Sequence, residues 1–443
     1  MSSVHTTSIE ISDAEHHRQL KRAVIASTIG TAIEWYDFFI YGIVAALVFG
    51  QLCFPESEPL TGTLLAFGTF FIGFIARPIG AAIFGHFGDR IGRKQTLVAT
   101  LMLMGISTFL IALVPTYEII GIWGAVILTL LRFVQGIGVG GEWGGAVLMS
   151  MEWARTNKHR GFIASWPQFG VPVGLFLGNF VVLGVSLMTQ DDFVTWGWRI
   201  PFVLSFLLVI VGLYIRLGVM ETPTFRKMQK ENRIEEAPMI KVIKEQPKEI
   251  IVSAFARMGE NASFYIFTAF VLAYGTQQLS IDRDFLLRSV LVASVLSFIW
   301  IPLFGWMSDR IGRKRMYLIG SVATAVFAFI YFALMGTGST TLVFIAIALS
   351  LLPHNMMYGP QAALIAESFR GNLRYSGASL GYQLTSIIAG GPAPIIATAL
   401  LAQYNSGYAV AFYVAFCAVV SFISTLLLKD FTNKDISSDQ DYA

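Results

Sequence analysis

A series of long apolar stretches, separated by short charged segments, limits what this chain can fold into more than any other feature. A helix needs about 20 mostly apolar residues to cross the hydrocarbon core of a bilayer. On that scale the sequence predicts twelve membrane-spanning helices. They are expected at 23–50, 61–84, 95–114, 119–149, 161–187, 199–219, 249–279, 286–306, 316–335, 340–365, 376–402 and 407–428. Only 13% of the residues are charged, against about 25% in a typical soluble domain, which excludes a soluble fold.

Positive charge is distributed unevenly over the segments that connect these spans. The cytoplasmic segments of membrane proteins carry an excess of Lys and Arg. With the N-terminus placed inside, 25 of the 31 Lys and Arg residues fall on the cytoplasmic side. Of the others, three fall outside and three lie within spans: Arg77, Arg132 and Arg257. Both termini are therefore expected in the cytoplasm.

The longest polar stretch lies in the middle of the sequence, after six predicted spans and before six more. It divides the chain into a cytoplasmic tail (1–22), a six-helix half (23–219), a cytoplasmic linker (220–248), a second six-helix half (249–428) and a second cytoplasmic tail (429–443).

The hexapeptide DRIGRK occurs at residues 89–94 and again at 309–314. Each copy falls in the predicted cytoplasmic turn after the second span of a half. Glu152 and Glu367, at the ends of the fourth and tenth spans, repeat with nearly the same separation. Internal repeats of this kind are typical of transporters built from two halves, with the substrate site near the bilayer midplane between them.

The residue types in each copy of the hexapeptide are suited to hold neighbouring helices together at the cytoplasmic side. An Asp can accept hydrogen bonds from the N-terminus of a neighbouring helix, where the helix dipole favours a carboxylate. Glycine allows a tight turn, and the basic residues can pair with the repeated glutamates. We therefore predict a cytoplasmic gate, closed while the molecule faces outward. Its residues are Gly85, Asp89, Arg90, Gly92, Arg93 and Glu152 in the first half and Asp309, Arg310, Gly312, Arg313 and Glu367 in the second.

The pattern G-x-x-x-D-R-x-G-R-K resembles the signature turn of the major facilitator superfamily. A closer resemblance, to the metabolite:proton symporter family, covers nearly the whole chain. It is carried by IEWYDFFIYG (33–42), ARPIGAAIFGHFGDRIGRK (76–94), RFVQGIGVGGEWGGA (132–146), WGWRIPF (196–202) and RYSGASLGYQ (374–383). That family includes permeases for shikimate, 2-oxoglutarate, citrate and proline or betaine, and the shikimate type is the most similar of these.

The resemblance implies an all-α integral membrane protein with twelve transmembrane helices in two six-helix halves. It implies proton-coupled uptake of a small organic acid, such as shikimate, by alternating access in the inner membrane of a prokaryote. A monomer is expected to be functional, without a cofactor, a metal ion or a nucleic-acid partner. No nucleophile–base pair, nucleotide loop or metal cluster is evident in the sequence, so an enzyme is not expected.

Ionisable residues inside a membrane are functional candidates. Glu34 and Asp37 share one face of the first span, with Tyr41 a turn further on. Arg132 and Gln135 share one face of the fourth span, which neighbours the first in this superfamily. We predict that Asp37 pairs with Arg132 and carries the proton, with Arg132 setting its pKa. Glu34 is the competing carrier, and a static ion pair between two helices is the alternative.

The second half offers a charged stripe on the seventh span, where Arg257, Glu260 and Asn261 lie on one face. Arg is suited to bidentate recognition of a carboxylate, so Arg257 is expected to contact an anionic substrate, with Asn261 adding a hydrogen bond. Alternatively, Arg257 and Glu260 satisfy each other. The substrate-binding set is completed by Tyr41, Gln135, Gln168, His354, Tyr358 and Gln383.

Two further points remain open. Arg77, just before Pro78 near the cytoplasmic end of the second span, is expected to have a structural role, reaching the interface or pairing with a neighbouring helix. The fifth span lacks the G-x-x-x-G-P-x-x-G-G pattern of efflux antiporters, and the C-terminal tail lacks the coiled coil of osmosensing betaine carriers. Efflux is thus the less favoured alternative. The missing coiled coil argues against osmosensing and leaves uptake of a zwitterion open.

Overall fold

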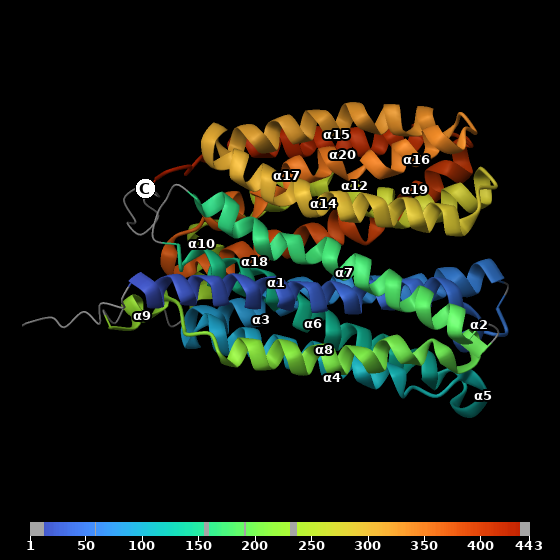
Figure 1. Ribbon diagram of the computed structural model, residues 1–443, viewed down its shortest axis with the longest axis horizontal. Coiled ribbons are helices and arrows are strands. Elements are labelled where there is room, and N and C mark those ends of the chain that lie inside the picture. The colour runs from blue at the N-terminus through green and yellow to red at the C-terminus, as the bar shows by residue number, and fades with distance from the viewer. Residues whose placement is uncertain (1–12, 58, 155–158, 190–191, 231–236, 435–443) are drawn as a thin grey trace, which may run out of the picture.

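The computed structural model describes residues 13–57, 59–154, 159–189, 192–230 and 237–434. Over these residues the chain is built from helices and their connections, and the long helices run side by side along one axis (Figure 1). In the described part of the chain they form twelve rods, as the apolar stretches predict. The first and last described residues lie at the same end of the molecule (Figure 1).

The first six rods follow each other in the order of the predicted spans. The first is α1 (Asp13–Val44), continued by a π-helical turn (Ala45–Phe49) and α2 (Gly50–Cys53). The others are α3 (Pro59–Ile91), α4 (Arg93–Ala112), α6 (Trp123–Met151), α7 (Arg160–Thr189) and α8 (Arg199–Leu217). Short α5 (Tyr117–Ile120) precedes α6, and a π-helical turn (Phe193–Gly197) precedes α8.

The second six rods are more often interrupted. The seventh contains α11 (Pro247–Ala256), α12 (Met258–Tyr265), a π-helical turn (Ile266–Phe270), α13 (Val271–Ala273) and a second such turn (Tyr274–Gln278). Next come α14 (Arg283–Ile311), α15 (Arg313–Met335), α16 (Thr340–Leu349) with α17 (Leu351–Ala366), then α18 (Arg374–Thr385) with α19 (Pro392–Tyr404), and α20 (Gly407–Leu427). The predicted linker contains α9 (Pro223–Lys230) and α10 (Pro238–Glu245).

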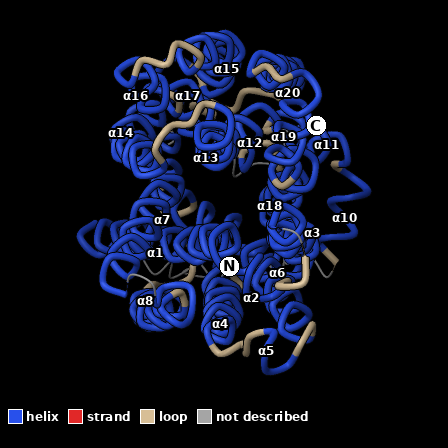
Figure 2. The backbone as a smooth tube through the Cα atoms, turned by 90° about the vertical axis from the view of Figure 1, so that its right-hand side faces the viewer, coloured by secondary structure: helices blue, strands red, loops and turns tan. Residues whose placement is uncertain are grey.

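The rods form two bundles of six, which lie one above the other in Figure 1. The bundles meet along two interfaces: α7 packs on α14 and α17, and α18 packs on α3 and α6. Figure 2, which looks along the axis, shows these interfaces on opposite sides of the centre of the molecule.

Ten helices in the described part are long and apolar enough to cross a membrane. The first and seventh rods are not among them. The first carries Glu34 and Asp37, and the seventh is divided into short helices near Arg257 and Glu260. The two rods outside this set therefore carry the predicted proton carriers, Glu34 and Asp37, and the charged stripe of Arg257 and Glu260.

Glycines bring α3 and α6 into direct backbone contact. A Cβ added to Gly80 would lie 2.0 Å from the carbonyl oxygen of Ile137, and one added to Gly140 would lie 2.0 Å from that of Arg77. Small residues allow membrane helices to approach this closely. The glycine-rich run of the fourth span thus serves helix packing, and it places α6 against the centre of α3.

Candidate functional site

The first DRIGRK turn joins the two halves at one end of the molecule. Asp89, at the end of α3, accepts hydrogen bonds from the backbone N–H (2.9 Å) and the hydroxyl (2.8 Å) of Ser376, in the first turn of α18. Arg93 pairs with Asp89 (3.3 Å) and with Glu152 (3.4 Å). Gly92 has a φ of 115°, in the region that favours glycine. The Asp of the first half therefore caps a helix of the second.

The second turn makes the reciprocal contacts. Asp309 accepts hydrogen bonds from the backbone N–H groups of Gly161 (2.8 Å) and Phe162 (2.9 Å), in the first turn of α7. Arg313 pairs with Asp309 (3.1 Å) and Glu367 (3.2 Å), and Arg160 also pairs with Glu367 (2.9 Å). The backbone of Gly312 has a φ of 103°.

Two residues of the predicted gate lie apart from these contacts. Arg90 and Arg310 are both exposed, and the Arg310 guanidinium covers the ring of Trp306 at 3.9 Å. Helical spacing explains the difference, because each Arg follows its Asp by one position and so points away from it. Gly85, by contrast, lies at the interface, where an added Cβ would be 2.9 Å from the Cα of Ser376.

Asp37 is fully buried in the first half, and it is not in direct contact with Arg132. Its two carboxylate oxygens accept hydrogen bonds from Ser205 (2.5 Å) and Thr108 (2.9 Å). Thr108 accepts a hydrogen bond from Gln135 (2.7 Å), and Gln135 accepts one from Arg132. The predicted ion pair is replaced by a relay, because Gln135 lies one turn after Arg132 and occupies the space between the two charges.

Arg132 and Arg77 are buried among aromatic rings. The Arg132 guanidinium faces Tyr41 (4.5 Å), Phe38 (4.8 Å) and Phe70 (4.9 Å), and its Nε and Nη2 atoms have no hydrogen-bond partner among the described residues. The predicted site residue Tyr41 directs its hydroxyl to Thr69 instead (2.7 Å). The Arg77 guanidinium shares the Phe38 ring with Arg132 and also faces Trp35 and Phe74.

The remaining charges of the first half are divided between a pair and a lone acid. Glu142 pairs with Arg216 and accepts a hydrogen bond from Thr100 (2.9 Å). Glu34 is 4% exposed and makes no hydrogen bond or ion pair with the described residues. The Glu142–Arg216 pair was not predicted; Arg216, near the end of the predicted sixth span (199–219), lies in the last turn of α8 and is buried.

Arg257, the expected substrate contact of the second half, is fully engaged by the protein. Its guanidinium donates to Gln361 Oε1 (3.2 Å), to the Tyr382 carbonyl oxygen (2.5 Å) and to Glu260 (3.0 Å). Glu260 also contacts His354 Nε2 (3.2 Å). This geometry favours the alternative that Arg257 and Glu260 satisfy each other.

An aromatic stack links this cluster to the first half. The Arg257 guanidinium lies 3.3 Å from the centre of the Tyr382 ring, and that ring stacks on Trp143 of α6 at 3.7 Å. Trp143 donates to Gln168 (2.9 Å), whose amide reaches the Tyr358 carbonyl oxygen (3.4 Å). The stack therefore holds α6, α7, α17 and α18 together at the centre of the molecule. Sequence patterns gave no sign of Trp143 in this role, because glycines surround it.

The remaining predicted substrate contacts lie near this cluster in different ways. The His354 ring stacks on Tyr358 (5.1 Å) and packs at a tilt against Phe264 (5.3 Å). Asn261 is 7% exposed, and its Oδ1 atom is unpartnered among the described residues. Gln383 does not join the cluster; it accepts a hydrogen bond from Ser386 on its own rod (3.1 Å).

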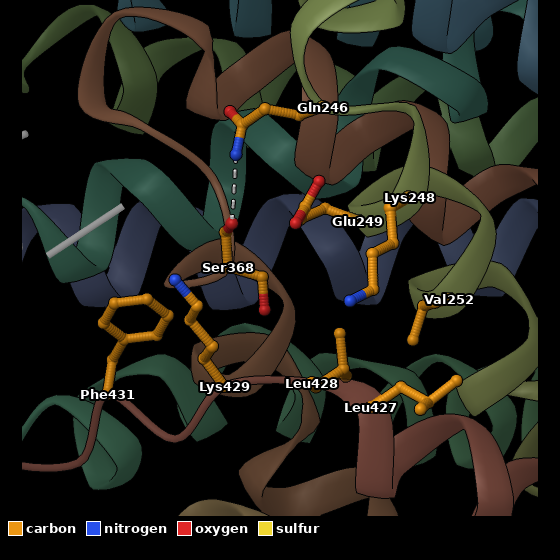
Figure 3. A pocket seen from close by; sticks show the side chains of 9 residues that line it. All are labelled: Gln246, Lys248, Glu249, Val252, Ser368, Leu427, Leu428, Lys429 and Phe431. Carbon is orange, nitrogen blue, oxygen red and sulfur yellow. Dashed lines mark hydrogen bonds between the residues drawn. The ribbon is translucent and has the colours of Figure 1, made fainter. Parts of the chain in front are cut away.

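A separate pocket opens near the end of the molecule that carries the DRIGRK turns (Figure 3). It lies between the start of α11, Ser368 and the segment after α20, and its lining includes Gln246, Lys248, Glu249 and Lys429. None of the predicted proton-binding or substrate-binding residues lines it.

Comparison with known proteins gives consistent results over nearly the whole chain. Residues 23–253 match the family model described as "Sugar (and other) transporter", and residues 144–402 match "MFS/sugar transport protein". The chain is 41% identical to the shikimate transporter of Escherichia coli (strain K12), over 93% of this chain and 94% of the relative. It is 40% identical to the inner membrane metabolite transport protein YhjE of the same organism, over 92% of this chain and 93% of the relative.

Among solved structures, the proton:xylose symporter XylE bound to 6-bromo-6-deoxy-D-glucose superimposes with a TM-score of 0.77. The alignment covers 95% of this chain and 98% of the other, at 17% sequence identity. At that identity the likeness concerns the fold alone.

Proposed function

The chain belongs to the major facilitator superfamily of membrane transporters, and on that premise we propose that it takes up a small organic carboxylate together with protons by alternating access. The single observation that carries the proposal is the state of the buried charges in the first half. A protonatable carboxylate and unpaired guanidinium groups lie there together, without direct ion pairs between them. Shikimate is the first candidate substrate, because the chain is 41% identical to the shikimate transporter of Escherichia coli. We place the protein in the inner membrane of a prokaryote and expect a functional monomer.

Charge balance explains how a proton and an anion would bind together. Glu142 and Arg216 neutralise each other, which leaves two acids, Glu34 and Asp37, and two guanidinium groups, Arg77 and Arg132. Burying a charge without a partner is costly. If one acid takes up a proton, one guanidinium loses its compensating negative charge. A carboxylate substrate can then supply that negative charge. The proton and the anion then strengthen each other's binding, and by linkage the effect is reciprocal.

The hydrogen bonds of Asp37 favour it over Glu34 as the proton carrier. Its partners are the hydroxyls of Ser205 and Thr108. A hydroxyl can donate to a carboxylate or accept from a carboxylic acid after a simple rotation, so both protonation states are accommodated. The relay through Thr108 and Gln135 carries the change to Arg132.

The reciprocal caps describe the conformational part of the cycle. Asp89 and Asp309 together accept four hydrogen bonds from the opposite halves. We assign this end to the cytoplasmic side, so the structure corresponds to a state that is closed toward the cytoplasm. Release of substrate inward requires both caps to separate.

The experiment that tests the proposal is transport in proteoliposomes. With an inward proton gradient and a pH-sensitive dye inside, adding shikimate is expected to acidify the lumen; quinate, benzoate, 2-oxoglutarate, proline and betaine form the comparison panel. Acidification with proline or betaine alone would overturn the carboxylate assignment. Accumulation of an acid without acidification would overturn proton coupling.

A further inference from the structure

Arg77 has so far entered only the charge balance, without a ligand assigned to it, and its position differs from the one the sequence suggested. It lies twelve residues before Asp89 on the same helix, which corresponds to about 18 Å along the axis. That distance places it near the middle of the membrane and away from the cytoplasmic end. Its side chain is 4% exposed, so it does not reach an interface with water.

The guanidinium of Arg77 also has no polar partner. It makes no hydrogen bond or ion pair with any described residue, and its Nη2 atom is completely buried. Its neighbours are the rings of Phe38 (4.7 Å), Phe74 (4.7 Å) and Trp35 (5.7 Å). Cation–π contacts compensate a buried charge only in part. Glu34 lies within electrostatic range of Arg77 but forms no ion pair with it, so the donors of the guanidinium remain available to an anion.

Two unpartnered polar groups of the second half lie beside these rings or one helical turn away from them. Tyr265, at the end of α12, packs against Phe74 (5.4 Å) and Phe38 (6.2 Å), and its buried hydroxyl has no partner among the described residues. Asn261 precedes it by one helical turn on the same face, and its Oδ1 atom is likewise unpartnered. A hydrogen-bonding group buried without a partner is rare in a folded protein and calls for an explanation.

We propose that Arg77 binds the carboxylate of the transported acid, with the Tyr265 hydroxyl donating to the same carboxylate from the opposite half. Asn261 Oδ1 accepts a hydrogen bond from a hydroxyl of the substrate, and Phe38 and Phe74 cover its apolar face. The ligand class is a small hydroxylated cyclic carboxylate. The assignment rests on the proposed function and replaces Arg257, whose donors are already used by Gln361, Tyr382 and Glu260.

Because the ligand would touch both halves, it would also favour their closure around it. The unpaired guanidinium of Arg132 faces Phe38 as well, at 4.8 Å. Arg132 thus provides a second positive charge beside the site and connects it to Asp37 through the relay.

Binding to the purified protein in detergent, measured by calorimetry with shikimate and its methyl ester, tests the site separately from transport. Arg77→Gln is expected to raise the Kd for shikimate at least about 30-fold, because a charge-assisted contact is lost, and to bind acid and ester alike. Arg77→Lys is expected to lose less. Tyr265→Phe is expected to raise the Kd roughly tenfold without loss of thermal stability, since the hydroxyl it removes has no partner in the empty protein.

Tyr331→Phe is the matched control. Its hydroxyl is also buried without a partner among the described residues, but its ring packs on Phe267 and Phe332 inside the second half. Its Kd should equal that of the wild type. Wild-type-like binding by Arg77→Gln and Tyr265→Phe would overturn the site, as would the absence of shikimate binding to the wild type. Binding that depends on Arg77 without acidification in proteoliposomes would overturn symport and leave the site standing.

Discussion

The contacts of Asp37 and Arg257 show how differently two buried charges can be held. Asp37 is bonded to two hydroxyls, which can follow a change in its protonation. Arg257 is fixed by an amide, a backbone carbonyl and a carboxylate, and its face is covered by Tyr382. The first arrangement suits a group that changes state during transport, and the second suits a structural support.

Asp37→Asn is expected to abolish uphill accumulation of shikimate and to preserve exchange. Asn can still bond to Ser205 and Thr108 but cannot take up a proton. Accumulation under an imposed proton gradient and counterflow without a gradient, both in proteoliposomes, measure the two activities. Glu34→Gln serves as the control and should still accumulate substrate. The reverse pattern, with accumulation lost only in Glu34→Gln, would move the proton to Glu34.

Arg257→Gln is expected to destabilise the protein by about 3 kcal/mol or more, because it leaves Glu260 buried without its charge partner. Thermal unfolding in detergent measures the change. The double variant Arg257→Gln/Glu260→Gln should be more stable than the single one, since no unpaired charge remains. If the double variant is instead the least stable, Arg257 and Glu260 act independently and the proposed mutual satisfaction is wrong.

At the scale of elements, the most informative contacts are the caps between helices of different halves. The N-terminal turn of α7 is capped by Asp309 from the end of α14, and the N-terminal turn of α18 is capped by Asp89 from the end of α3. A carboxylate at a helix N-terminus satisfies backbone N–H groups that have no partner within the helix. Each cap therefore holds the end of a helix as well as the contact between halves.

Asp309→Ala is expected to speed amide hydrogen exchange in the first turn of α7, at Gly161 and Phe162, because these N–H groups lose their acceptor. Asp89→Ala should do the same at Ser376 in α18. Hydrogen exchange followed by mass spectrometry resolves the two segments. Arg310→Gln, at an exposed position of the same turn, should leave both segments unchanged. Faster exchange confined to the mutated half would contradict the reciprocal caps.

Over the whole molecule, sequence and structure agree where local patterns decide the outcome. The lengths of the apolar stretches predicted the twelve rods. The glycines of the repeated hexapeptide have the positive φ that a tight turn requires. Helical spacing tells which residues share a face but not which neighbour that face meets. For this reason the direct Asp37–Arg132 pair was wrong, and the positions of Trp143, Arg77 and Tyr265 could not be predicted.

The charge balance of the first half also gives a prediction for the whole molecule. Two acids face two guanidinium groups, so one proton accompanying one monoanionic acid keeps the site neutral. Uptake of shikimate should then change less than about twofold when a potassium diffusion potential is imposed at constant pH, because no net charge crosses the membrane. Quinate, also a monoanion, provides a parallel measurement. Strong acceleration by an inside-negative potential would indicate two protons, with Glu34 as well as Asp37 titrating.

The two caps also restrict how the halves can move. Figure 2 places the α3–α18 and α7–α14 contacts on opposite sides of the centre. A single contact would leave one half free to rotate relative to the other about that contact. With a contact on each side, movement at one contact is expected to strain the other. We therefore expect the two caps to open together, so that forms with only one cap released are disfavoured.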